Sequence, residues 1–244
     1  TYQFIKYLNI DPNDIEQVHW DPVDKNTLYY PKGTSYYKHD VTTNTSTLLR
    51  NFSQAPTSCS GSVSYGDDPQ YMSWGSEKVV GLLCGKTKFI YSLSTNQVLG
   101  QASLSGTLAP VVGPTGTLAI LNSIVYNTSF TSLRTLDIYS FDEHASIGKN
   151  ASGQDVYNMS SYDGNYVGTL VSYNMVSGAA SVLIGPDKGY PYPPSGTHVS
   201  SLAIKNPGWV VTSTVGNVSG KGVLDQELDL ANVDSGVVCR LAHH

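Results

Sequence analysis

A hairpin with the same ending recurs along this chain, and it constrains the fold more than any other feature. Four segments consist of a strand of alternating polar and apolar residues, a short turn of Thr, Ser, Asn or Gly, and a second strand: SYYKHDVTTNTSTLL, KFIYSLSTNQVL, TLVSYNMVSGAASVL and QELDLANVDSGVVCRL. Such a hairpin cannot bury its apolar face alone, so its copies must stack on one another. The repetition therefore predicts a modular all-β protein.

Five units can be traced, and each contains about four strands. No window of the sequence has a convincing helical period. Four strands in a unit of roughly 40–55 residues are typical of a β-propeller blade. We therefore predict an all-β fold, a β-propeller with about five four-stranded antiparallel blades, forming a single domain over residues 1–244. A β-sandwich is the alternative, but it would not repeat one hairpin at this spacing.

The number of units leaves two alternatives for the ring. Either five blades close it, or the chain is a fragment of a larger propeller, since six to eight blades are common. The final dipeptide, His243-His244, resembles the opening of a sixth unit and favours the second alternative.

Composition excludes some partners and indicates a compartment. Charged residues make up only 14% of the chain and the net charge is −5, so no basic cluster is available to bind nucleic acid. No apolar run reaches the ~20 residues needed to span a bilayer. The low charge and an excess of glycosylation sequons indicate an extracellular, secreted or cell-surface protein. The sequon asparagines are Asn44, Asn51, Asn127, Asn150, Asn158 and Asn217.

Three cysteines allow at most one internal disulfide and leave one free thiol. Cys59 lies in a loop that could tolerate a bridge. Cys84 and Cys239 lie in apolar strands, so we expect buried free thiols there. No Cys-x-x-Cys pair is present, which excludes a zinc knuckle.

The last two units resemble a known lineage. The phrases YPYPPSGTHVSSLAIKNPGWVVTS and LDQELDLANVDSGVVCRLAHH are similar to those of secreted bacterial propellers related to oligogalacturonate lyases and ulvan lyases, and the resemblance is clearest over residues 144–244. It implies that His, Tyr and Arg side chains at a channel mouth neutralise a uronate and abstract its C5 proton, and that histidines hold a divalent metal in some members. Arginine is scarce in this chain, which departs from that pattern.

The histidines are the main candidates for chemistry. His19, His144 and His198 lie at or beside the start of a first strand, and first strands line the channel of a propeller. We predict His198 and His144 as catalytic residues, His19 as a substrate-binding residue, and His243 and His244 as ligands of one divalent metal. The alternative is that each histidine only holds neighbouring blades together.

A loop rich in proline precedes His198. It carries Tyr190 and Tyr192, whose rings could bind a sugar. We predict that Tyr190 binds substrate and that Tyr192 takes part in catalysis; the alternative is that both cover a sheet edge. Arg240 falls on an outer strand, where it is poorly placed to neutralise a carboxylate in the channel.

One further group of charges alternates along a strand. Asp225, Glu227 and Asp229 share a strand face, and we interpret this face as solvated rather than as a Ca²⁺ site. The leading functional hypothesis is an extracellular propeller that engages carbohydrate, in particular an acidic polysaccharide, at one channel mouth, with lyase β-elimination as its chemistry. The alternative is a non-catalytic, glycosylated module that has a structural role or binds another protein.

Overall fold

The computed structural model describes residues 4–10, 18–21, 23–61, 63–65, 72–104, 106, 108–138, 145–161, 164–188, 196–201, 206–214 and 227–243. These residues form five antiparallel sheets with almost no helix; the helical turns among them are the 3-10 segments η2 (Gly164–Tyr166) and η3 (Pro186–Lys188). The side chains of residues 72, 186, 196–198, 214 and 243 lie outside the description.

Each sheet is one blade, and its strands follow one another in sequence order. Blade 1 contains β1 (His19–Trp20), β2 (Thr27–Lys32), β3 (Ser35–Asp40) and β4 (Thr45–Asn51); blade 2 contains β5 (Val63–Ser64), β7 (Glu77–Cys84), β8 (Thr87–Ser92) and β9 (Gln97–Ser103), with β6 (Met72–Trp74) also paired to β7; blade 3 contains β10 (Val111–Val112), β11 (Leu118–Leu121), β12 (Ile124–Asn127) and β13 (Ser132–Thr135); blade 4 contains β14 (Ala145–Lys149), β15 (Asp155–Ser161), β16 (Thr169–Asn174) and β17 (Ala180–Ile184); blade 5 contains β18 (Gly196–Ser201), β19 (Trp209–Thr214), β20 (Glu227–Asn232) and β21 (Val238–His243).

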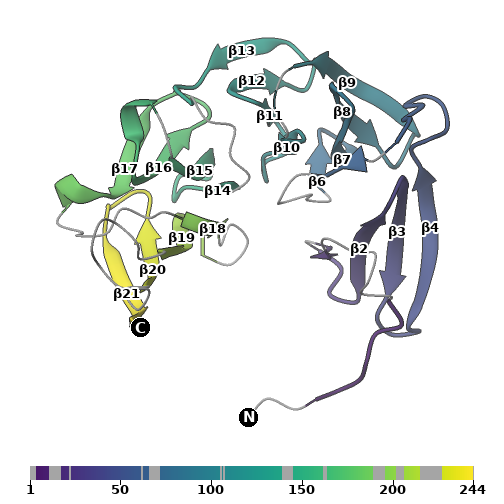
Figure 1. Ribbon diagram of the computed structural model, residues 1–244, viewed down its shortest axis with the longest axis horizontal. Helices are drawn as coiled ribbons and strands as arrows, with labels where there is room; N and C mark the ends of the chain where they lie inside the picture. Colours follow the sequence, from purple (N-terminus) through teal and green to yellow (C-terminus); the bar gives the residue numbers. More distant parts are fainter. Residues whose placement is uncertain are drawn as a thin grey trace.

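The blades are arranged around a central space, and the ring is open between blade 1 and blade 5 (Figure 1). The fourth strands lie on the outside of the ring, whereas β10, β14 and β18 lie near its centre. The predicted all-β propeller with five four-stranded antiparallel blades is thus confirmed.

A polar residue at the end of each third strand explains why the hairpin recurs. The side-chain oxygen of this residue accepts hydrogen bonds from backbone N–H groups two to four positions further on, as an Asx or Ser turn does. In blade 4, Asn174 Oδ1 accepts from the N–H groups of Val176 and Ser177, both at 2.9 Å. The equivalent residues are Asp40, Ser92, Asn127 and Asn232.

The turn also needs a residue with a left-handed backbone, and every blade has one. This residue has φ +81° at Gly178 in blade 4 and φ +60° at Asn44 in blade 1; the others are Asn96, Phe130 and Gly236. Glycine and asparagine adopt this conformation at low cost, which accounts for most of these positions.

The strand order gives the disc two distinct faces. The turns between first and second strands and between third and fourth strands lie on one face, which we call the turn face. The segments that connect one blade to the next lie on the opposite face, which we call the connection face.

Alternating apolar residues of adjacent sheets pack into four clusters, one at each contact between neighbouring blades. Examples are Tyr36 with Tyr91 between blades 1 and 2, and Leu170 with Val210 between blades 4 and 5. The other two clusters join blades 2 and 3 through Ile90 and blades 3 and 4 through Ile147. Stability therefore comes from contacts between neighbours, as in other repeat proteins.

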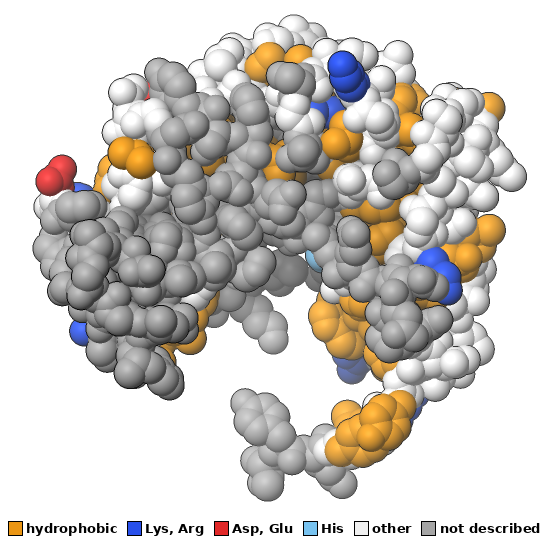
Figure 2. Space-filling view, viewed as in Figure 1, with side chains coloured by type: hydrophobic (Ala, Val, Ile, Leu, Met, Phe, Trp, Pro, Cys, Tyr) orange, Lys and Arg blue, Asp and Glu red, His pale blue; other side chains and the backbone are white. Residues whose placement is uncertain are grey.

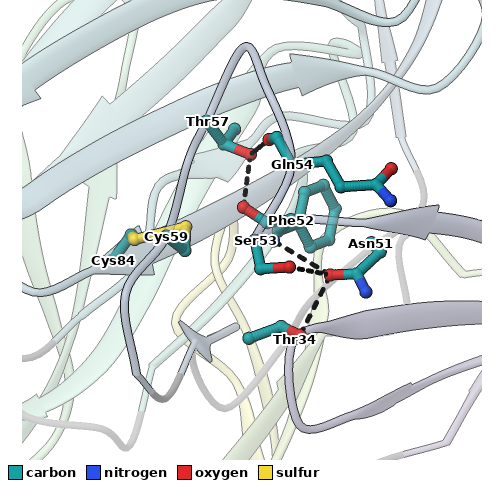
Figure 3. The surroundings of a disulfide bond; sticks show 8 residues. All are labelled: Thr34, Asn51, Phe52, Ser53, Gln54, Thr57, Cys59 and Cys84. Atoms are coloured by element: carbon teal, nitrogen blue, oxygen red, sulfur yellow. Dashed lines mark hydrogen bonds between the residues drawn. A yellow bond between two sulfur atoms is a disulfide. The ribbon is translucent and has the colours of Figure 1, made fainter.

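A disulfide crosses the contact between blades 1 and 2 on the connection face, and it corrects the prediction for Cys84. The bond joins Cys59, in the segment after β4, to Cys84 at the end of β7, with 5.6 Å between their Cα atoms (Figure 3). The same segment is held by Asn51 Oδ1, which accepts from Ser53 and Thr34, and by Thr57, which donates to the Phe52 carbonyl. Cys84 lies in an apolar strand, as expected, but the connection brings its partner to it.

Cys239 corrects a second expectation. Its thiol is free, as the count of three predicts, but it is exposed rather than buried. The strand β21 is the outermost of blade 5, and the face that carries Cys239 is not covered by another blade.

Candidate functional site

The predicted histidine site falls where the first strands of blades 4 and 5 begin. Strand β18 packs against β14 and β15, and the last residue of β18, Ser201, lies beside Ser146 at the start of β14. His144, Tyr190, Tyr192 and His244 lie outside the described residues. Convergence of these side chains into a pocket therefore stays a prediction.

Strand β18 is irregular at His198. The pairing of β18 with β19 shifts register between Gly196 and Val199, so His198 lies in a β-bulge. Bulges re-aim side chains and are common beside active sites. In sequence, His144 precedes Ser146 by two residues and His198 precedes Ser201 by three, and Ser201 N donates to Ser146 Oγ at 3.0 Å across the contact between blades 4 and 5. The side chain of His198 itself is not described.

His19 lies in a different place from the other two histidines. It belongs to β1 and pairs with Tyr29, in a blade separated from blades 4 and 5 by blades 2 and 3 on one side and by the open sector on the other (Figure 1). Burial lowers the pKa of His19 to about 4, so its imidazole is neutral at physiological pH.

Among the side chains that the structure describes, no group of three His, Cys, Asp or Glu could hold an ion. The side chain of His243 is outside that set, so its predicted role as a ligand stays a prediction.

The alternating carboxylates of β20 are buried, which corrects the interpretation of a solvated face. Glu227 and Asp229 point toward blade 4, and Asp229 is 0% exposed. Glu227 Oε1 lies 2.7 Å from Nη2 of Arg240, whereas neither oxygen of Asp229 has a hydrogen-bond partner among the described residues. Asp225 lies outside them. Burial, and next the charge of Glu227, raise the pKa of Asp229 to about 6.

Across this contact, blade 4 presents a row of small polar side chains. Ser146, Asn158, Ser172 and Ser181 are paired in register across the four strands and therefore share one sheet face. Asn158 Nδ2 donates to Ser201 Oγ of blade 5 at 3.0 Å. The blade 4–blade 5 contact is thus partly apolar and partly a polar layer.

The polar row ends in a cleft on the turn face. This cleft has a volume of about 180 Å³ and lies between the turns of blade 4 and the last turn of blade 5. Its lining combines amides, hydroxyls and one carboxylate with three small apolar side chains: Asn150, Ser172, Asn174, Ser177, Ser181, Asp234, Val156, Ala179 and Val233. The predicted histidine site and this cleft lie on opposite faces of the disc.

Some of the side chains that line the cleft already make hydrogen bonds within the protein. Gln154 Oε1 accepts from the amides of Asn150 and Asn174. Asp234 Oδ2 accepts from the Ala151 N–H at 2.8 Å and so links the two blades. By contrast, the Ser172 and Ser181 hydroxyls make no hydrogen bond within the described part of the protein, and the sequence reasoning missed both. The signal that could have pointed to the cleft is Asp234, a charged residue at the position where the other four turns carry Thr42, Ser94, Ser129 and Val176.

The sequons differ in accessibility. Asn158 is 0% exposed in the centre of blade 4, which leaves no room for a glycan in the folded chain. Asn150 is also buried, and it lines the cleft. Asn44, Asn51 and Asn127 lie in or beside turns, where glycosylation stays a prediction, and Asn217 is outside the described residues.

Comparisons with known proteins support the fold. No family model matches the chain, and no curated protein matches it. Among solved structures, it is similar to a chain of Kuenenia stuttgartiensis hydrazine synthase, with a TM-score of 0.56 and 12% identity over 98% of this chain and 69% of that one. At this identity the likeness shows a propeller-like architecture alone, and the lyase lineage stays a hypothesis. Within the described residues, no helix is both long and apolar enough to cross a bilayer.

Proposed function

We propose that this protein is an extracellular propeller that engages carbohydrate, and that the cleft between blades 4 and 5 binds one sugar unit. The cleft carries the proposal because unengaged hydroxyls and a carboxylate line it together with valine and alanine side chains. Sugar hydroxyls both donate and accept, so Ser172, Ser181 and Asp234 suit them. The volume is below the ~300–1,000 Å³ usual for drug-sized ligands, which limits the cleft to a single small unit.

A separate observation, the disulfide, supports the extracellular location. Disulfides persist in oxidising environments and are rare in the cytosol, and the Cys59–Cys84 bond closes the first blade contact. Together with the partly exposed sequons in or beside turns, it favours a secreted or cell-surface protein.

Binding can be tested by saturation-transfer NMR with a panel of neutral and acidic oligosaccharides. Replacing Ser172 by Ala or Asp234 by Asn should weaken the bound sugar at least fivefold, because each removes a hydrogen-bonding group or its charge. Ser129→Ala, in the equivalent turn of blade 3, is the matched control and should change nothing. Absence of transfer from every sugar would refute carbohydrate binding.

Lyase chemistry is a second proposal, supported by the packing of β18 against β14 and the bulge at His198. A base there would remove the C5 proton of a uronate while the glycosidic oxygen leaves with a proton from an acid, giving an unsaturated sugar. Product formation from acidic polysaccharides is read as ultraviolet absorbance. His198→Ala should abolish it, whereas Ser200→Ala, two residues along β18, should leave it intact. A wild-type protein inactive on all acidic polysaccharides would leave the non-catalytic module as the better account.

A further inference from the structure

A segment near the N-terminus, residues 4–10, is attached to the turn between β3 and β4. The segment has no helix or strand and extends away from blade 1 beside this turn (Figure 1). We call it the N-terminal arm. The side chain of Asn44, in the turn, contacts it at two points: the Asn9 N–H donates to Oδ1 at 2.8 Å, and Nδ2 donates to the Tyr7 carbonyl at 3.3 Å. The carboxamide thus pairs with the arm as a neighbouring strand would.

The turn itself does not need this carboxamide. The backbone of Asn44 is left-handed, with φ +60°, and its N–H donates to the Asp40 carbonyl at 2.8 Å. Gly178 and Gly236 take the equivalent position in blades 4 and 5 without any side chain. The amide group of Asn44 is therefore available for the arm.

Few other contacts hold the arm in place. Its side chains Phe4, Ile5 and Tyr7 are 67%, 87% and 84% exposed, so they bury little apolar surface. One more hydrogen bond runs from Lys6 Nζ to the Thr42 carbonyl, at 3.2 Å. Hydrogen bonds between exposed groups stabilise a contact only modestly, and segments held in this way open at low cost in free energy. The carboxamide of the turn therefore has a large influence on whether the arm is docked.

The same carboxamide is the acceptor of the sequon Asn44-Thr45-Ser46. Its two partners lie two residues apart on one segment, so they approach the same edge of the carboxamide. The hydrogen that Nδ2 donates is therefore the one on the Oδ1 side. A glycosylated asparagine is a secondary amide, and secondary amides are planar and trans. In the trans form, C1 of the sugar lies on the Oδ1 side, in place of that hydrogen.

We propose that the carboxamide of Asn44 either holds the N-terminal arm or carries an N-linked glycan, and that the glycan releases the arm. In this modification, Nδ2 forms a bond to C1 of a sugar carried as a diphosphate ester. The bond from C1 to the phosphate oxygen breaks, the diphosphate leaves with the bonding electrons, and the nitrogen loses one proton. Because coupling between two sites is reciprocal, a docked arm also protects Asn44 from modification. The proposal does not depend on sugar binding in the cleft.

Hydrogen exchange of the Asn9 amide measures whether the arm is docked. In wild-type protein from a host without N-glycosylation, this amide should exchange about fivefold more slowly, or less, than in a free peptide of residues 4–10. Asn44→Gly keeps the left-handed backbone but removes the carboxamide, so it should abolish the protection. Asn96→Gly, the same change at φ +59° in blade 2, is the matched control and should preserve it. A wild-type amide that exchanges at the peptide rate overturns the proposal, and so does protection that survives Asn44→Gly.

Modification of the folded protein tests the exclusion itself. The protein is treated with an oligosaccharyltransferase and a lipid-linked oligosaccharide diphosphate, and the glycan is trimmed to one sugar so that its bulk is not the cause. A sugar on Asn44 should remove the protection of the Asn9 amide. Asn9→Pro removes the N–H that Oδ1 accepts, so it should raise the occupancy of Asn44 about threefold or more in peptide mass spectrometry. The occupancy of Asn127, a sequon in blade 3, is the control and should not change.

Two results of this second experiment overturn the proposal. One is an Asn9 amide that stays protected with a sugar on Asn44. The other is an occupancy of Asn44 that Asn9→Pro leaves unchanged, including an occupancy of zero in both proteins.

Discussion

At the scale of single residues, polar side chains at two kinds of position have opposite effects. Those at the ends of third strands, such as Asn174, stabilise the turn that follows them. Asp229 is instead enclosed between two blades, where its carboxylate has no hydrogen-bond partner among the described residues. A buried polar group without a partner costs free energy. One class of side chain thus specifies the fold, and the other weakens it.

Replacing Asn174 by Ala should lower the free energy of unfolding by about 1–2 kcal/mol, since the N–H groups of Val176 and Ser177 lose their acceptor. Urea denaturation measures this change. Ser129→Ala, which removes no acceptor from the equivalent turn of blade 3, should have no effect. An Asn174→Ala protein as stable as the wild type would show that backbone conformation alone holds the turn.

Replacing Asp229 by Asn should stabilise the protein at pH 7.5, by on the order of 2 kcal/mol. The folded pKa of about 6 exceeds the ordinary 3.8, so the folded state holds the proton more tightly than the unfolded chain. The wild type therefore loses stability as the pH rises from about 4 to about 6, and the variant does not. Thermal unfolding across this range provides the measurement.

The pKa of Asp40 shifts in the opposite direction to that of Asp229. Hydrogen bonds from the Thr43 and Thr42 backbone lower the pKa of its exposed carboxyl. Asp40→Asn should therefore weaken the protein above pH 4 and have little effect below it. If both variants changed the pH profile in the same direction, the burial of Asp229 would not be the cause.

At the scale of elements, the blades and the segments between them differ in how far the sequence reveals them. The outer hairpins of blades 1, 2, 4 and 5 were predictable, because strand alternation and turn residues lie within about fifteen positions of each other. The partnership of Cys59 with Cys84 was not, since it depends on how one connection folds back onto the next blade. The burial of Glu227 and Asp229 was also missed, because alternating charges on a strand look solvated unless another sheet is known to cover them. The histidine and tyrosine site stays a prediction, because the convergence of its side chains depends on loops that a repeat pattern does not specify.

Removing the disulfide should destabilise the contact between blades 1 and 2. Chain-entropy arguments give about 3.5 kcal/mol for a bridge that closes a separation of 25 residues. The double variant Cys59→Ala/Cys84→Ala should therefore unfold at a clearly lower temperature under non-reducing conditions. Cys239→Ser, which removes the exposed thiol, should leave the melting temperature unchanged, and a reducing agent should lower it in Cys239→Ser but not in the double variant.

At the scale of the whole molecule, the five blades form a linear series bent into an open ring. Each interior blade is covered on both faces, whereas blade 5 is covered on one. The open sector between the two ends of the series is visible in the space-filling view (Figure 2). In such arrays, stability is approximately a sum of unit and nearest-neighbour terms. The outward face of blade 1 is partly covered, because Leu28, Tyr30 and His39 are buried there whereas Trp20 and Leu48 are exposed.

Hydrogen exchange should reflect how many neighbouring blades cover each blade. Backbone amides of β19 and β20 should exchange faster than those of β11 and β12 or of β15 and β16, since blade 5 lacks one neighbour. Mass spectrometry of peptides from exchanged protein at low concentration tests the order. Uniform exchange across all blades would show instead that the molecule opens as one cooperative unit.

The turns at the ends of the third strands have a consequence for inheritance. The stop signal of each hairpin consists of one polar residue and one left-handed residue four positions later, or three in blade 3. A duplicated unit would carry its own signal with it, and the original copy would lose nothing. Gene duplication can therefore lengthen or shorten such a protein one unit at a time, and only the two surfaces at each new junction need later mutation to fit.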